Sequence, residues 1–135
     1  SSDNKMLSYL DKNKVPYIPK KVYDIPLEKI IYYYSYPQIV LGMRGHSQLI
    51  PFGCGTKIIS LITHSKLGWF LDDISASNWG ISVINNNKLD KQILNKVNVI
   101  VNDNMIYDKI EREKEKLFDI TKSNIDKIIM NLNKP

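Results

Sequence analysis

The sequence lacks several residues and motifs that mark common protein classes. It has one cysteine, Cys54, so an intrachain disulfide framework is excluded. No apolar run approaches the roughly 18 residues that a membrane-spanning helix needs. There is no HExxH, Walker A or GxGxxG motif, and no metal or nucleotide cofactor is expected. A single cysteine fits a reducing compartment, so the expected location is cytoplasmic.

Arginine is also scarce, with only Arg44 and Arg112 among 19 basic residues. Proteins that read nucleic-acid bases usually rely on arginine. The lysines are spread along the chain and mixed with asparagine, without a basic cluster that alternates with aromatic residues. We therefore interpret the net charge of +5 as a solvated surface and expect no nucleic-acid partner.

The six glycines all lie between positions 42 and 80. In this region, short β-branched apolar runs alternate with segments whose apolar residues recur at helical spacing. Strands are expected at 39–41, 57–62 and 80–84, and helices at 4–13, 26–35, 46–52, 66–74, 90–102 and 104–133. Strands that alternate with helices indicate a parallel sheet. The sequence thus predicts one α/β domain over residues 1–135, a three-layer Rossmann-like parallel sheet flanked by helices, with a long C-terminal helix.

The most informative segment is the one that carries Arg44 and His46. It follows the apolar run 39–41 and opens the expected helix at 46–52. Ligands of open α/β sheets bind at the carboxyl ends of the strands, and helix N-termini attract anions. The segment predicts a site for phosphate or carboxylate, to which the backbone N–H groups of Ser47 and Gln48 are expected to contribute.

Several motifs around this segment resemble the polysaccharide pyruvyl transferase family. They are VLGMRGHS at 40–47, FGCGTKIISL at 52–61, Lys66, and LDD at 71–73. The similarity covers about 39–84. The family usually has leucine where this chain has Gly45, alanine at Ser47, and proline near Lys57. The resemblance implies the C-terminal half of a two-domain, glycosyltransferase-B-like enzyme, with an upstream domain that binds the acceptor.

That family transfers a pyruvyl group from phosphoenolpyruvate to a saccharide, forming a cyclic ketal and releasing phosphate. The resemblance implies phosphoenolpyruvate as co-substrate, a saccharide acceptor and no metal. Arg44 and His46 are the expected catalytic residues, with Arg44 holding the donor and His46 protonating the enol carbon. Further donor contacts are expected from Gly45, Ser47 and Lys66, and Lys66 would neutralise the departing phosphate. The isolated domain is expected to be inactive.

Each of these residues also has an ordinary structural interpretation. Arg44 as an ion-pair partner, His46 as a capping or core histidine, and Lys66 as a solvated side chain are the main ones. For the other side chains we expect structural roles: His64 and the pair Asp72–Asp73 on the surface, Cys54 as a small buried residue, and Trp69 and Trp79 as core anchors.

Two other functions remain open on the sequence. The first is the donor domain of a nucleotide-sugar glycosyltransferase of the same fold, which would need a carboxylate near a strand end to bind the ribose. The second is a non-catalytic module that retains the fold. The acceptor saccharide is not specified by this sequence.

Overall fold

The computed structural model describes residues 2–134, with side chains from Asn4 onward. The elements follow the expected order: α1 (Ser2–Lys12), α2 (Leu27–Ser35), β1 (Ile39–Gly42), α3 (His46–Gly53), β2 (Lys57–Ile62), α4 (Ser65–Asp73), the 3-10 turn η1 (Ser77–Trp79), β3 (Gly80–Ser82), α5 (Leu89–Asn102) and α6 (Met105–Leu132). The mixed α/β class and the long C-terminal helix are confirmed. β3 ends two residues earlier than expected.

The three strands form one parallel sheet in the order β1-β2-β3. Ile39 of β1 is level with Lys57 of β2, and Ser60 of β2 is level with Gly80 of β3. β2 is central because its run KIISLI is apolar enough to be covered on both faces. The parallel sheet flanked by helices is therefore as the sequence predicts.

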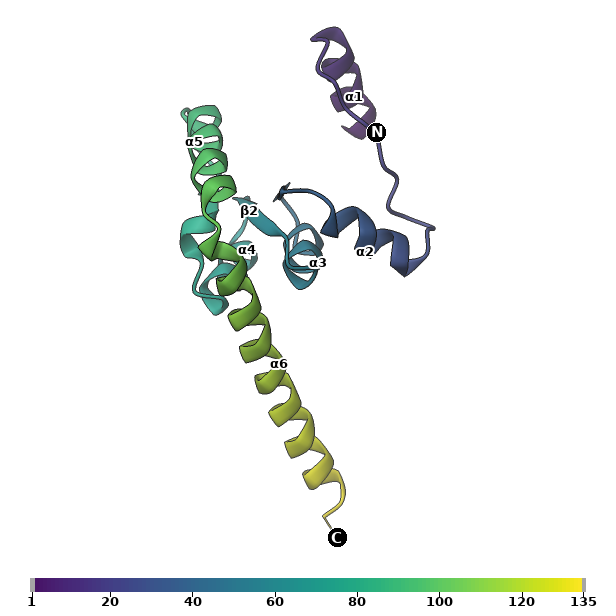
Figure 1. The fold of residues 1–135 in the computed structure, drawn as a ribbon, viewed down its shortest axis with the longest axis vertical. Coiled ribbons are helices and arrows are strands. Elements are labelled where there is room, and N and C mark those ends of the chain that lie inside the picture. Colours follow the sequence, from purple (N-terminus) through teal and green to yellow (C-terminus); the bar gives the residue numbers. More distant parts are fainter. Residues whose placement is uncertain (1, 135) are drawn as a thin grey trace.

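Helices cover both faces of β2 because its side chains alternate in direction. Ser60 contacts Gln48 of α3 on one face, whereas Lys57 reaches the end of α5 on the other. Figure 1 shows β2 between α3 and α5. α4 lies on the α3 side, because the Cα–Cβ direction of Gly80, level with Ser60, points toward Leu71 of α4.

The hydrophobic core joins the sheet to the helices on its two faces. Its fully buried members include Ile59 of β2, Leu71 of α4 and Ile110 of α6. Trp79 packs in this core, as expected. The expectation for Trp69 is wrong: its side chain is 59% exposed, since it lies on the face of α4 opposite the buried Leu67 and Leu71.

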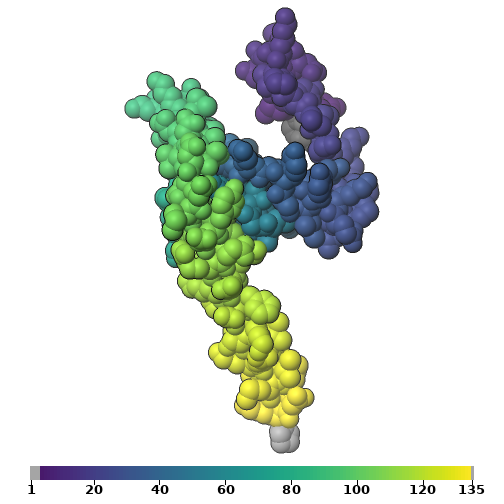
Figure 2. Space-filling model, in the orientation of Figure 1, coloured from purple at the N-terminus to yellow at the C-terminus, as the bar shows by residue number. Residues whose placement is uncertain are grey.

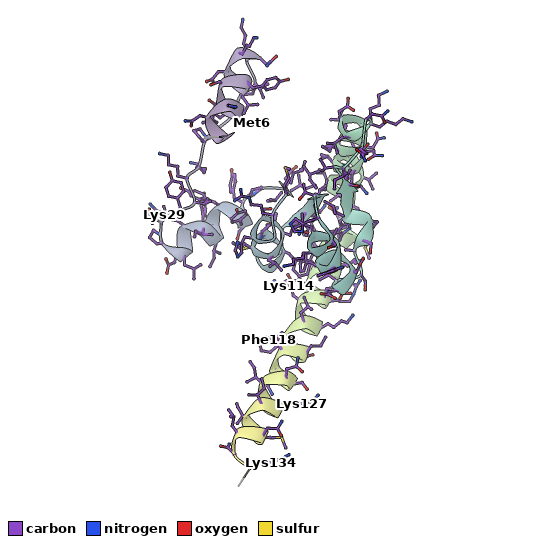
Figure 3. The ribbon with its side chains drawn as sticks, turned by 180° about the vertical axis from the view of Figure 1, so that it is seen from behind. Met6, Lys29, Lys114, Phe118, Lys127 and Lys134 are labelled. Atoms are coloured by element: carbon purple, nitrogen blue, oxygen red, sulfur yellow. The ribbon has the colours of Figure 1, made fainter. Side chains whose placement is uncertain are left out.

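Two parts of the chain extend away from this core. The last turns of α6 project from it, and from Phe118 to Lys134 every residue is exposed (Figures 1 and 2). Figure 3 shows Phe118 and Lys127 on this projecting part, and Met6 on α1, which a thin connection separates from the sheet. Both parts carry exposed apolar side chains, among them Met6, Tyr9, Phe118, Ile125, Ile128 and Leu132. Within residues 2–134, no helix is long and apolar enough to cross a bilayer.

Replacing Gly68 with alanine is expected to stabilise the domain. Gly68 lies inside α4, and a Cβ built there meets no atom within 4 Å. Alanine is better than glycine in a helix interior by up to about 1 kcal/mol. We expect the free energy of unfolding to rise by about 0.5–1 kcal/mol and Tm by about 2–4 °C in a thermal melt followed by circular dichroism.

The matched control for this change is Gly80→Ala. A Cβ at Gly80 would lie 2.5 Å from Ile62 Cδ1 and 2.9 Å from Leu71 Cδ1, so Tm should fall. A lower Tm for Gly68→Ala would contradict the inference that a Cβ fits at this position without displacing a neighbour.

Candidate anion site at the carboxyl edge of the sheet

Three loops leave the sheet from the same edge because the strands are parallel. They are residues 43–45 after β1, 63–64 after β2 and 83–88 after β3. These loops and the first turns of α3 and α4 contain no Asp or Glu, whereas the first turn of α5 carries Asp90. They carry five groups that are or can become cationic: Arg44, His46, His64, Lys66 and Lys88. This edge therefore attracts anions.

The loop after β1 is fixed by a short turn from Arg44 to Ser47. Ser47 Oγ accepts a hydrogen bond from the N–H of Arg44 at 3.1 Å and donates one to the Arg44 carbonyl at 2.6 Å. The N–H of Ser47 also donates to that carbonyl, at 3.0 Å. Ser47 thus holds the backbone from which the Arg44 side chain extends.

This turn changes the expected role of the backbone donors. The N–H of Ser47 is occupied by the Arg44 carbonyl, and the N–H of Gln48 donates to the Gly45 carbonyl at 3.0 Å. The expectation that these two N–H groups are free to bind an anion is therefore wrong. Both N–H groups are used within the first turn of α3, because Gly45 already has helical dihedral angles, φ −52° and ψ −48°.

The side chains of Arg44, His46, His64 and Lys66 are exposed. Among the side chains of residues 4–134, no ion pair or hydrogen bond joins any of them to another group. The interpretation of Arg44 as an ion-pair partner is therefore wrong. The interpretation of His46 as a core or capping histidine is also wrong, because its side chain is exposed and α3 has no side-chain cap. The strand ends bring these four residues to one edge of the sheet, where the described residues offer no partner to their side-chain nitrogens.

Gly45 is not required by its surroundings. Its φ is negative, and a Cβ there meets nothing within 4 Å. The position would accept the Cβ of an alanine. Gly42 is different, because a Cβ there would overlap Ser47, lying 2.0 Å from its Oγ. The close approach of α3 to the end of β1 therefore depends on Gly42.

Sequence reasoning missed a buried polar pair behind this edge. The Ser60 hydroxyl donates a hydrogen bond to Gln48 Oε1, and both residues are at most 1% exposed. The pair joins α3 to the centre of β2, and so positions the helix that begins at His46. The signal was partly present, since Ser60 is a polar residue inside the apolar run 58–62, whereas Gln48 follows two other polar residues.

Sequence reasoning also missed Lys57, which is 1% exposed at the amino end of β2. Its Nζ donates to the carbonyls of Ile100 and Val101, each at 2.9 Å, and lies 4.5 Å from the Tyr107 ring centre. These carbonyls belong to the last turn of α5, where a cation is favourable. Lys57 is on the edge opposite the anion site, so its role is structural.

Comparison with known protein families, curated proteins and solved structures finds no match for this chain. Among the described residues, no group of three or more His, Cys, Asp or Glu side chains lies close enough to hold a metal ion. The features of the chain that bear on function are the cationic edge and the motifs around Arg44.

Proposed function

We propose that this chain is the Rossmann-like, donor-binding half of a two-domain pyruvyl transferase that moves a pyruvyl group from phosphoenolpyruvate to a saccharide. The observation that carries the proposal is the carboxyl edge of the sheet, where Arg44, His46 and Lys66 have no side-chain partner among residues 4–134 and no acidic neighbour in sequence. A concentration of free cations at strand ends suits a ligand with more than one negative charge.

Phosphoenolpyruvate presents a phosphate and a carboxylate, and Arg44 and Lys66 suit these two groups differently. The planar guanidinium of Arg44 can bind either group through two parallel hydrogen bonds. Lys66 follows β2 and offers a compact charge that can balance the departing phosphate. Ser47 would act through Arg44, because its hydroxyl is used in the turn.

In this mechanism His46 supplies a proton to the methylene carbon of the donor. The double-bond electrons take that proton, and the adjacent carbon becomes oxocarbenium-like. A saccharide hydroxyl then attacks that carbon and its proton returns to His46. A second hydroxyl displaces phosphate to close the ketal, and its proton leaves with the phosphate. A positioned acid of this kind accelerates such steps about 10²–10⁴-fold.

The exposure of this edge favours a partner domain that encloses it. Such chemistry needs water to be excluded, and the Arg44 and His46 side chains are open to solvent. Large exposed apolar side chains on α6 and α1 suit packing against another domain. The isolated chain should therefore bind the donor without turning it over.

Replacing Arg44 with alanine is expected to weaken binding of phosphoenolpyruvate by about tenfold or more, since each charged hydrogen bond contributes about 1.5–3 kcal/mol. Isothermal titration calorimetry on the full chain measures this. The matched control is Arg112→Ala, the other arginine, which lies on α6 and should leave the affinity unchanged. Equal affinities for the three proteins would contradict the role of Arg44.

The nucleotide-sugar alternative is less well supported. A ribose is usually bound by a carboxylate near a strand end. None of the three loops at this edge carries one, and Asp72 and Asp73 lie at the far end of α4. Asp90, in the first turn of α5, is the acidic residue that follows a strand most directly. Binding of nucleoside diphosphates in preference to phosphoenolpyruvate would nevertheless favour it.

A further inference from the structure

A second candidate site lies at the free edge of the sheet, beside β3. A hollow of about 650 Å³ opens between β3 and α5, which we call the β3–α5 hollow. This volume is typical of small-molecule sites. Its floor is apolar, formed by Ile81 and Ile100. Its polar lining consists of Asn78, Ser82, Asn86, Gln92, Asn95 and Lys96.

The main chain of β3 offers little to an added strand. The N–H of Val83 donates to Ile62 of β2, and alternate residues of a strand face opposite neighbours, so the main-chain groups of Gly80 and Ser82 face the hollow. The Ser82 carbonyl already accepts from Asn86 Nδ2 at 2.7 Å, and the Gly80 N–H donates to Ser77. Two of the four main-chain groups that an extended peptide would need, the Gly80 N–H and the Ser82 carbonyl, therefore already have hydrogen-bond partners.

The polar lining is almost entirely neutral. Four of its six side chains are amides, one is a hydroxyl, and none is a carboxylate. Lys96 is the only charged residue of the lining, and its Nζ donates a hydrogen bond to the Asn78 carbonyl. An anionic ligand would find little charge here, and an apolar ligand would cover the amides and leave them unpaired.

Amide side chains suit hydroxyl groups because each offers both a donor and an acceptor, and a hydroxyl uses both. Among the described residues, no hydrogen bond engages the side-chain amides of Asn78 and Asn95. We propose that the β3–α5 hollow binds a neutral saccharide through Asn78 and Asn95, with Ile81 beneath the ring. This inference does not depend on the function proposed for the carboxyl edge.

The test follows the side-chain amide signals of Asn and Gln in nitrogen-15 NMR spectra of the full chain. The probes are N-acetylglucosamine, lactose and maltose, with inorganic phosphate as the anionic comparison. At least one saccharide should shift the signals of Asn78 and Asn95 with saturation in the millimolar range. Phosphate should leave these two signals in place.

A pair of variants separates this site from general effects. Asn95→Leu should weaken saccharide binding about fivefold or more, since an amide makes two hydrogen bonds. Asn98→Leu is the matched control on the same helix, because Asn98 is exposed and outside the hollow, and its affinity should stay within about twofold of the original. The proposal is overturned if no saccharide moves the Asn78 and Asn95 signals up to about 100 mM. It is also overturned if the two variants lose binding equally.

Discussion

Replacing Gly42 with alanine is expected to lower the free energy of unfolding by about 3 kcal/mol, the largest effect of any single change considered. The new Cβ would lie 2.0 Å from Ser47 Oγ, 2.5 Å from Ser47 Cβ and 2.9 Å from the Ser47 carbonyl oxygen. A carbonyl of the helix backbone cannot rotate away, so α3 must move off β1. Urea unfolding followed by circular dichroism measures the loss.

Second changes at Ser47 test whether this overlap is the cause. Ser47→Gly removes both Oγ and Cβ, leaving only the 2.9 Å contact, so it should recover part of the stability of Gly42→Ala. Ser47→Ala keeps Cβ and should recover less. Equal recovery by the two changes, or none by either, would contradict the proposed overlap.

The matched control is Gly45→Ala, three residues along the chain. Its backbone is already helical and its Cβ direction is open, so this change should be neutral or raise the free energy of unfolding by up to about 1 kcal/mol. The contrast between the two glycines also bears on the anion site. Gly42→Ala should weaken phosphoenolpyruvate binding as α3 shifts, whereas Gly45→Ala should not.

Replacing Lys57 with methionine is expected to lower the free energy of unfolding by about 2 kcal/mol. Methionine keeps most of the volume but leaves the carbonyls of Ile100 and Val101 without the Nζ donor, and each loss costs about 1–3 kcal/mol. Removing a buried charge recovers part of that cost. The contact with the Tyr107 ring is lost as well.

Lys91→Met is the matched control, since Lys91 is an exposed lysine of α5. It should change the free energy of unfolding by less than about 0.5 kcal/mol. Tyr107→Leu removes only the ring contact and should cost about 0.5–2 kcal/mol. If Lys57→Met were as stable as Lys91→Met, the two carbonyls would not depend on the lysine.

Much of the fold could be predicted from local pattern. β2 was found because its β-branched apolar run suits a strand covered on both faces, and α6 because apolar residues recur at helical spacing. The end of β3 was placed two residues too late. Val83 still bonds to Ile62, but the chain turns away immediately, and Asn85 takes a φ of +53°. Local preference for strand cannot anticipate such a turn.

The candidate site was predictable only in part. Arg44, His46 and Lys66 were found because they follow strands, and parallel strands bring their ends to one edge. The hydrogen bonds of the Ser47 hydroxyl to the Arg44 backbone depend on how closely α3 approaches β1. This distance is set by tertiary packing, which local sequence patterns do not show. The burial of Lys57 was missed for the same reason, because its partners lie more than 40 residues away in sequence.

The two halves of the long helix α6 are stabilised by different interactions. Its 28 residues span about 42 Å, while a compact chain of this length has a radius of gyration of about 14 Å. The first turns carry Ile106 and Ile110 and share the cooperativity of the core. The turns beyond Phe118 depend on helix propensity and on pairs such as Lys122–Asp126, which contribute tenths of a kcal/mol. Any surface that covers Phe118 to Leu132 would therefore determine whether this half of the helix is stable, and not only where it lies.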